Sequence, residues 1–324
     1  MGDSHGADGT NERLVWVSFL LLTLAWGTSF MFIKVAVQSV QPLTLVASRL
    51  LIGTAGLVLI MRLRGLHFPQ QRRIWGHLIV IGAVNVAIPF VLITWAESGV
   101  QGLDSGVTSI LNSTVPLFSI VIAGVLWQME QVTGGKVLGL LVGFGGVLVL
   151  LSRDGLGSWG NVLPVLAVTA AAACYAAGSV YARRMLHGIR PVVLAAGQLL
   201  VAAVIVLPAA LLLEDWGNQS FPPQTILALF WLGLMGSCLA YIFYFIVLQA
   251  WGATRTTLVT YLIPVVGVTA GVLFLGEELH WQIVAGGLLI LSGVGTVNLQ
   301  DEEIQTESGH SRSGEEPVSS ERMR

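Results

Sequence analysis

Residues 14–33 read LVWVSFLLLTLAWGTSFMFI, twenty consecutive residues without Asp, Glu, Lys or Arg. A run of about 20 apolar residues is the length that an α-helix needs to cross a bilayer. Nine further runs follow, and only the second of the ten holds a charge, Arg49. The runs are 14–33, 43–61, 74–96, 105–129, 137–152, 162–182, 192–213, 225–250, 256–276 and 281–299. The sequence therefore predicts an all-α, polytopic membrane protein with ten transmembrane helices.

The composition also indicates a membrane protein. Of the 324 residues, 54% are hydrophobic and only 10% are charged, and the mean hydropathy is +0.79. A soluble domain carries about 25% charged residues, so an ordinary soluble enzyme and a disordered protein are excluded. The formal net charge of −2 offers no basic face to a nucleic acid. The expected partners are the lipid bilayer and a small-molecule substrate.

The basic residues set the expected orientation. Thirteen of the 16 Lys and Arg fall in the termini and in every second loop, whereas Lys34 and Arg153 fall on the opposite side. Cytoplasmic loops are enriched in Lys and Arg, so we expect both termini in the cytoplasm and the chain in the inner (plasma) membrane. Residues 1–13 form a polar N-terminal tail. Residues 300–324, rich in Glu, Ser and Gly, are predicted to be a disordered cytoplasmic tail.

The first half of the chain recurs in the second. At an offset of 149, the residues Trp26, Lys34, Pro42 and Arg49 match Tyr175, Arg183, Pro191 and Gln198. At offsets of 148 and 147, the residues Pro116, Glu130, Gly139 and Gly146 match Pro264, Glu277, Gly286 and Gly293. Five spans per half is an odd number, so the repeat 161–299 is inverted relative to 14–152, with 153–160 as the linker. Inverted repeats are typical of secondary transporters, whose substrate site lies near the midplane between the halves.

These motifs resemble those of a known family, the EamA family of the drug/metabolite transporter superfamily. Residues 24–34 match its first helix, 42–51 its second and 286–294 its last. Its module of a proline followed by Gly-Glu is matched twice, by Pro116 with Glu130 and by Pro264 with 275–277. This sequence departs from the pattern at Met129, Tyr175 and Gln198. The resemblance implies two EamA repeats and export of small metabolites or drugs. It also implies a central cavity lined by helices one to four and six to nine, with helices five and ten at the periphery.

Arg49 is the one charge well inside a predicted span. It lies six residues after Leu43, about 9 Å below the expected outer boundary at a rise of 1.5 Å per residue. One interpretation is that it binds a substrate carboxylate or phosphate. The other is that its side chain snorkels to the outer interface or caps a backbone carbonyl. Lys34, at the end of the first span, is expected to be an interface anchor.

Two prolines lie near the middle of the fourth and ninth spans. Pro116 and Pro264 each remove a hydrogen bond to the carbonyl four residues earlier, those of Asn112 and Thr260. Free carbonyls at membrane depth are tolerated only against protein or a water-filled cavity. Pro116 and Pro264 are therefore predicted hinges next to the substrate site. The alternative is a simple kink whose neighbouring hydroxyls bond back to the helix.

Polar and aromatic side chains inside the spans complete the candidate site. Aromatic rings favour amphipathic or aromatic solutes, although they also serve as packing and interface anchors. The candidate substrate-binding residues are Trp26, Arg49, Asn85, Asn112, Thr114, Tyr175, Gln198 and Tyr261. We predict a secondary transporter, an exporter of small metabolites, amino-acid-like compounds or drugs, that works by alternating access. The alternatives are a membrane-embedded enzyme acting on lipid-linked substrates, and a channel.

Acidic residues are missing from the interior of the predicted spans. The nearest, Glu97 and Asp104, are expected to hydrate a loop. We therefore expect a carrier without a buried carboxylate relay, working as a facilitator or exchanger. No phosphate-binding loop, metal-ligand pattern or nucleophile motif occurs, so neither a cofactor nor a metal nor a catalytic residue is expected.

Glycines recur at four-residue spacing in the fifth span, at Gly135, Gly139 and Gly143, with Gly146 following. Small residues at this spacing let helices approach closely. The stripe is expected to pack within the chain. The alternative is a homodimer surface, so the chain is expected to be a monomer or a homodimer.

Overall fold

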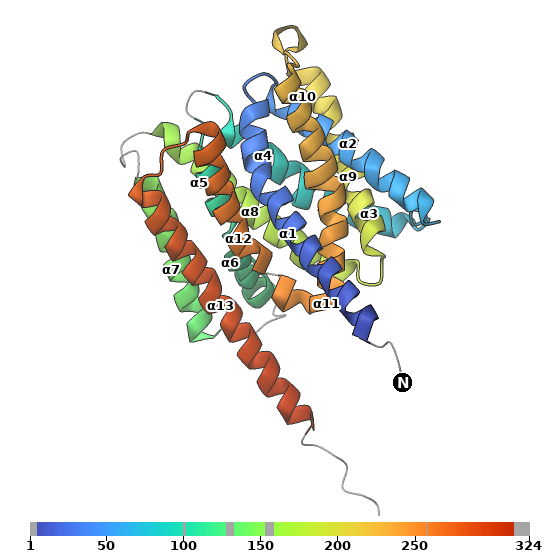
Figure 1. Ribbon diagram of the computed structural model, residues 1–324, viewed down its shortest axis with the longest axis vertical. Coiled ribbons are helices and arrows are strands. Elements are labelled where there is room, and N and C mark those ends of the chain that lie inside the picture. Colours follow the sequence, from blue (N-terminus) through green and yellow to red (C-terminus); the bar gives the residue numbers. More distant parts are fainter. Residues whose placement is uncertain (1–4, 100–101, 128–132, 153–158, 257, 314–324) are drawn as a thin grey trace, which may run out of the picture.

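The computed structural model describes residues 5–99, 102–127, 133–152, 159–256 and 258–313, and every regular element within these ranges is a helix (Figure 1). The first five spans are α1 (His5–Ala36), α2 (Pro42–Leu63), α3–η1–α4 (Arg72–Gly82, Ala83–Ala87, Ile88–Glu97), α5–α6–η2 (Ser105–Asn112, Val115–Ile120, Val121–Leu126) and α7 (Gly134–Leu151). The last five are α8 (Trp159–Met185), α9 (Pro191–Leu213), α10–η5–α11 (Pro223–Phe230, Trp231–Leu239, Ala240–Thr256), α12–η6 (Leu258–Ala270, Gly271–Leu275) and α13 (Trp281–Ser313). A short 3₁₀ turn, η4 (Trp216–Asn218), lies between α9 and α10.

The predicted all-α, ten-span architecture is confirmed. Within the described ranges, nine helical stretches are long and apolar enough to cross a membrane, and Trp281–Val297 is a shorter apolar helix in the tenth position. The chain differs from its prediction at the C-terminal end, where α13 continues as helix to Ser313 instead of giving way to disorder at residue 300. Extending an existing helix requires no new nucleation, so this polar segment can follow the apolar span as helix.

Spans 5 and 10 pair along one edge of the bundle, where Figure 1 shows α7 and α13 side by side. Glycines allow this close approach, because a Cβ on Gly146 would lie 2.6 Å from the carbonyl oxygen of Gly286, and one on Gly293 only 2.5 Å from that of Gly139. A Cβ on Gly143 would meet Leu117 of α6. Gly139, Gly143 and Gly146 of the stripe therefore pack within the chain, as the first interpretation had it. The state as monomer or homodimer stays a prediction.

The α7–α13 contact yields a stability prediction. Gly146→Ala should lower the free energy of unfolding by about 1–3 kcal/mol, the usual cost of overpacking. Gly145→Ala is the matched control, since a Cβ there meets nothing within 4 Å and alanine is the better helix former by about 1 kcal/mol. Thermal unfolding of the purified protein in detergent measures both. Equal melting temperatures for the two variants would show that the helices do not pack through these glycines.

The third and fourth spans of each half contain a π-helical segment. These segments are η1 and η2 in the first half, and η5 and η6 in the second. π-helical turns in α-helices occur frequently at functional sites. The sequence pattern did not indicate them, and two of them, η1 and η5, carry polar side chains of the candidate site.

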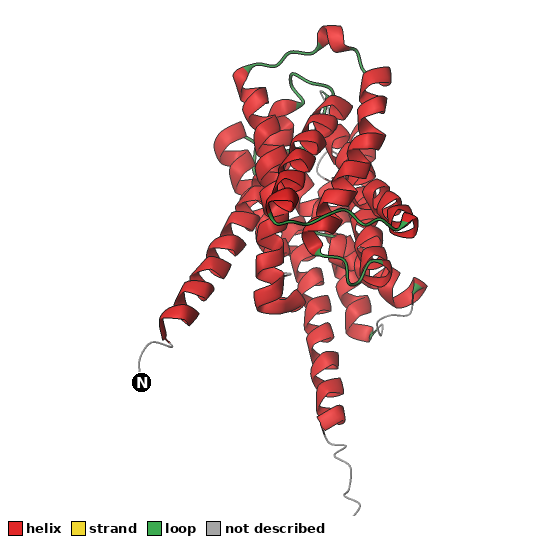
Figure 2. Cartoon of the chain, turned by 90° about the vertical axis from the view of Figure 1, so that its right-hand side faces the viewer, coloured by secondary structure: helices red, strands yellow, loops and turns green. Residues whose placement is uncertain are grey.

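Helix α1 begins and α13 ends at the same end of the bundle, as both views show (Figures 1 and 2). We call the opposite end the distal end. There Glu214 accepts hydrogen bonds from the backbone N–H groups of Leu43 and Thr44, at 2.6 and 2.7 Å, and Glu277 accepts those of Ser105 and Gly106, at 2.6 and 3.0 Å. Carboxylates at helix N-termini are favoured by the helix dipole. These contacts join the two halves at the distal end, and we call them the distal seal.

Candidate functional site

Arg49 lies in the centre of the described bundle, on α2. Its side chain is buried, with 6% of the residue exposed, and its guanidinium carbon lies 4.0 Å from the centre of the Phe90 ring on α4. Nε donates a hydrogen bond to Ser237 Oγ of η5 at 2.8 Å. The side chain therefore points across to the other half of the chain and does not snorkel to the interface.

The guanidinium of Arg49 is only partly used. Among the described residues, Ser237 is its one hydrogen-bond partner. An arginine has five N–H donors, so the four on the two Nη atoms are available to a ligand. Gly236 lets the guanidinium and Ser29 approach its helix closely, because a Cβ there would lie 3.4 Å from one Nη and 2.9 Å from Ser29 Oγ.

Gln198 on α9 holds the corresponding place in the second half. Its side-chain oxygen accepts a hydrogen bond from Asn85 Nδ2 of η1 at 3.1 Å, and its Nε2 donates to the hydroxyl of Tyr241 at 3.1 Å. Asn85 Oδ1 accepts a longer bond from Ser179 Oγ at 3.5 Å. Both pairs thus join the two halves: Gln198 pairs with an amide of the first half, whereas Arg49 pairs with a serine of the second.

The two arrangements are related by the inverted repeat. A Cβ on Gly233 would lie 2.5 Å from Ile52 and 3.1 Å from the Arg49 carbonyl oxygen, and a Cβ on Gly82 would lie 2.7 Å from Val201 and 3.0 Å from the Gln198 carbonyl oxygen. Gly233 therefore corresponds to Gly82, which makes Gly236 the counterpart of Asn85 and Ser237 that of Val86. The large Arg49 faces a glycine, and the smaller Gln198 faces an asparagine. The site is symmetric in backbone and asymmetric in charge.

Aromatic rings surround these polar groups. Tyr175 meets Phe90 edge to face with ring centres 6.5 Å apart, and Arg49 lies within electrostatic range of Tyr175 and Tyr241. Trp26 meets Tyr244 at 5.8 Å. We define the central cluster as Trp26, Arg49, Asn85, Phe90, Tyr175, Gln198, Ser237, Tyr241 and Tyr244. It combines one cation, two amides and a set of aromatic faces.

Comparison with known proteins agrees with this arrangement of two halves. The family model described as "EamA-like transporter family" matches residues 14–152 and again residues 162–299. The chain belongs to the EamA-like transporter family. It is therefore a multi-pass membrane transporter of small metabolites built from two EamA repeats, as the motifs had indicated.

Relatives of this EamA chain are named as transporters. It is 28% identical to the "Uncharacterized transporter YvbV" of Bacillus subtilis (strain 168), over 86% of this chain and 89% of the relative. It is 25% identical to a "Probable amino-acid metabolite efflux pump" of Escherichia coli (strain K12), over 85% of this chain and 91% of the relative. A solved crystal structure with 20% sequence identity has the same fold, with a TM-score of 0.64 over 90% of this chain and 98% of that one.

Five of the eight predicted site residues of the EamA chain lie in the central cluster: Trp26, Arg49, Asn85, Tyr175 and Gln198. Asn112, Thr114 and Tyr261 have other neighbours in the contacts that the structure describes. Thr114 is fully buried and donates back to the Leu111 carbonyl of its own span at 2.7 Å. Tyr261 packs against a separate group of apolar side chains on spans 4 and 10. The oxygen of the Asn112 side chain is buried and makes no hydrogen bond among the described residues.

Sequence reasoning missed Phe90 and Ser237 as site residues, and Tyr241 and Tyr244 were not among the eight candidate substrate-binding residues. Ser237 follows Gly236 in an apolar run, and this pair of small residues is the signal that marks a close approach. Phe90 carries no such signal, because one phenylalanine in a span resembles any other.

The two predicted hinges differ in structure. Span 4 of the EamA chain breaks before Pro116, since α5 ends at Asn112 and α6 begins at Val115, whereas α12 continues through Pro264. The carbonyl of Thr260, freed by Pro264, accepts a hydrogen bond of 3.4 Å from Ser113 Oγ, which also donates to its own helix. Spans 4 and 9 are therefore linked at the prolines. Movement at these points stays a prediction.

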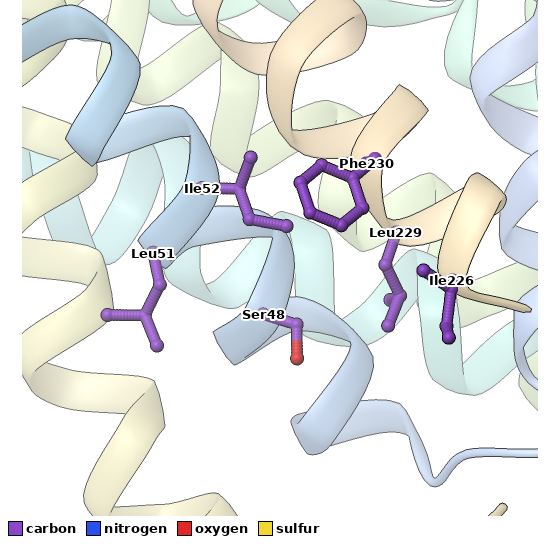
Figure 3. A pocket seen from close by; sticks show the side chains of 6 residues that line it. All are labelled: Ser48, Leu51, Ile52, Ile226, Leu229 and Phe230. Carbon is purple, nitrogen blue, oxygen red and sulfur yellow. The ribbon is translucent and has the colours of Figure 1, made fainter. Parts of the chain in front are cut away.

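Two cavities lie outside the central cluster. One of 320 Å³ is lined by Ser48, Leu51, Ile52, Ile226, Leu229 and Phe230, between α2 and α10 (Figure 3). Its lining is apolar apart from one hydroxyl, and Leu51 and Phe230 are about half exposed, so it opens to the lipid-facing surface. The other, of 340 Å³, lies at the distal end between Lys34 and Glu277. Neither contains the guanidinium of Arg49.

One expectation about the distal end is wrong. Glu97 does not hydrate a loop, since only 1% of the residue is exposed. Next to it, Lys34 Nζ donates to the carbonyls of Glu97, Gly102 and Leu103 at 3.2, 3.0 and 2.9 Å. Lys34 therefore ties Gly102 and Leu103 to the end of α4. Asp104 stays half-buried and lines the distal cavity.

Proposed function

We propose that this EamA transporter exports small metabolites that carry a carboxylate and an apolar or aromatic side chain, amino acids and related compounds among them. The observation that carries the proposal is the buried guanidinium of Arg49, which keeps four N–H donors for a ligand beside aromatic rings. Arginine binds a carboxylate through two parallel hydrogen bonds. The aromatic faces of Trp26, Tyr175 and Tyr244 would accommodate the side chain of such a ligand.

The remaining features support transport by alternating access. The inverted repeats carry related halves of one site, as in secondary transporters, and polar contacts join the two halves at the distal end. The distribution of Lys and Arg supports cytoplasmic termini in the inner membrane, so the distal end would be the outer one. A relative named as an amino-acid metabolite efflux pump supports both the substrate class and the direction.

Counterflow in proteoliposomes tests this function. Vesicles loaded with unlabelled L-phenylalanine should take up labelled L-phenylalanine with saturation, and L-phenylalaninamide should compete at least 10-fold less well. The amide lacks the charged acceptor, and a hydrogen bond to a charged group contributes about 1.5–3 kcal/mol. Protein-free vesicles are the control. Equal competition by the amide would contradict a carboxylate site, and ion conductance in place of saturable exchange would favour the channel alternative.

A further inference from the structure

The carboxyl group of Glu97 is buried at the distal end without a hydrogen-bond partner. Both of its oxygens are inaccessible, and neither has a partner among the described residues. The hydroxyl of Ser105, at the start of α5, is also buried without a partner at this end. An ionised carboxylate buried without donors carries a large free-energy cost, whereas the neutral acid carries much less. The burial of Glu97 in this structure therefore favours the neutral acid over the carboxylate.

The charged neighbours of Glu97 make hydrogen bonds to other groups, and none to its carboxyl among the described residues. Lys34 from α1 faces it, but an ammonium has three donors, and all three go to backbone carbonyls. Glu277, from the segment after η6, uses its two oxygens for the N-terminus of α5. Arg49 from α2 lies within electrostatic range, and its Nε binds Ser237.

The helices α5 and α8 also pack against α4. Thr108 of α5 faces the carboxyl, but its hydroxyl donates to the Asp104 carbonyl at 3.1 Å. That hydroxyl can still accept a hydrogen bond, which a neutral carboxyl could donate. From α8, Tyr175 meets Phe90, about two turns before Glu97. The surroundings thus suit a protonated Glu97.

We propose that Glu97 is a proton-binding site that controls the distal seal: its carboxylate takes up a proton from the distal solution when the seal closes, and returns it when the seal opens. The proposal rests on alternating access as the proposed function. Opening would free Lys34 from the three carbonyls and expose the carboxylate to water, so the proton passes from the Glu97 oxygen to solvent. By mass action, a higher pH at the distal side then favours the open state.

Cysteine labelling tests the seal without any substrate. The probe is a membrane-impermeant maleimide acting on Ser105→Cys, in a chain whose Cys174 and Cys238 are replaced by alanine. With Glu97 present, the labelling rate should rise at least 10-fold from mildly acidic to mildly alkaline solution, relative to Glu278→Cys in the same background. Glu278 is 81% exposed and corrects for the reactivity of the thiol itself. Glu97→Gln should remove the rise, and Glu97→Asp should keep it.

Infrared difference spectroscopy provides a second, direct readout. The spectrum of the wild type minus Glu97→Gln in proteoliposomes should contain the C=O stretching band of a protonated carboxyl. That band should disappear at high pH. Absence of the band at neutral pH, or a pH-dependent rise in labelling that persists in Glu97→Gln, would overturn the proposal. Neither the labelling rate nor the infrared band requires transport. If the L-phenylalanine counterflow failed, these two measurements would still test the role of Glu97 independently.

Discussion

Arg49→Gln should raise the KM for L-phenylalanine about 10- to 100-fold, the equivalent of losing about 1.5–3 kcal/mol from a hydrogen bond to a charged group. The inhibition constant of L-phenylalaninamide should change little, because the amide does not offer the charged acceptor that the guanidinium binds. The preference for the acid over the amide would therefore disappear. Glutamine is a suitable replacement since Gln198 already occupies the related position of the second repeat.

Kinetics of counterflow in proteoliposomes measure this effect. Arg62→Gln is the matched control: it is the same substitution on the same helix, at an exposed position near its end, and it should leave both constants unchanged. If Arg49→Gln kept the preference for the acid, another residue would bind the carboxylate. If Arg49→Gln lowered the uptake of every solute equally, its role would be structural.

Gln198→Arg should destabilise the protein by about 3 kcal/mol, the cost of a charge at the centre of a membrane helix on insertion scales. The cost arises because the surroundings of Gln198 lack two features of the surroundings of Arg49. Asn85 stands beside Gln198 where Gly236 stands beside Arg49, and Val86 takes the place of Ser237, which supplies an acceptor. The substituted arginine would be crowded and without its hydrogen-bond partner.

The inverted repeat also predicts which further substitutions should restore the stability that Gln198→Arg loses. Adding Asn85→Gly and Val86→Ser to Gln198→Arg rebuilds the arrangement of the first half and should recover at least half of the lost stability. Thermal unfolding in detergent of the single, double and triple variants measures this. Recovery by Asn85→Gly and Val86→Ser in a chain that retains Gln198 would show a general effect of the two substitutions, and no recovery in the triple variant would contradict the structural correspondence.

The spans and the repeat could be predicted from the sequence because each depends on local pattern. Ten apolar runs, nine of them uncharged, and a nearly constant offset between the halves are visible without knowing any contact. The interruptions within the spans were harder to predict. Pro116 indicated the one between α5 and α6, whereas no residue pattern indicated the π-helical segments η1 and η5.

The site could be predicted only in part for the same reason. Arg49 was conspicuous as a lone charge, but its partner Ser237 lies 188 residues away in sequence, so the pairing could not be predicted from local pattern. Glu97 was misplaced because its burial depends on the tertiary packing at the distal end. Thr114 was predicted from its neighbour Pro116, and the structure shows that its hydroxyl bonds to its own helix instead.

A crystal structure of the transporter with L-phenylalanine bound would examine the role of Arg49 without reference to kinetics. We predict that a carboxylate oxygen of the ligand lies within hydrogen-bond distance of an Arg49 Nη atom, with the phenyl ring against the aromatic side chains of the central cluster. A ligand bound elsewhere, in the distal cavity beside Lys34 or in the lipid-facing groove between α2 and α10, would contradict the assignment of Arg49 as the substrate-binding cation.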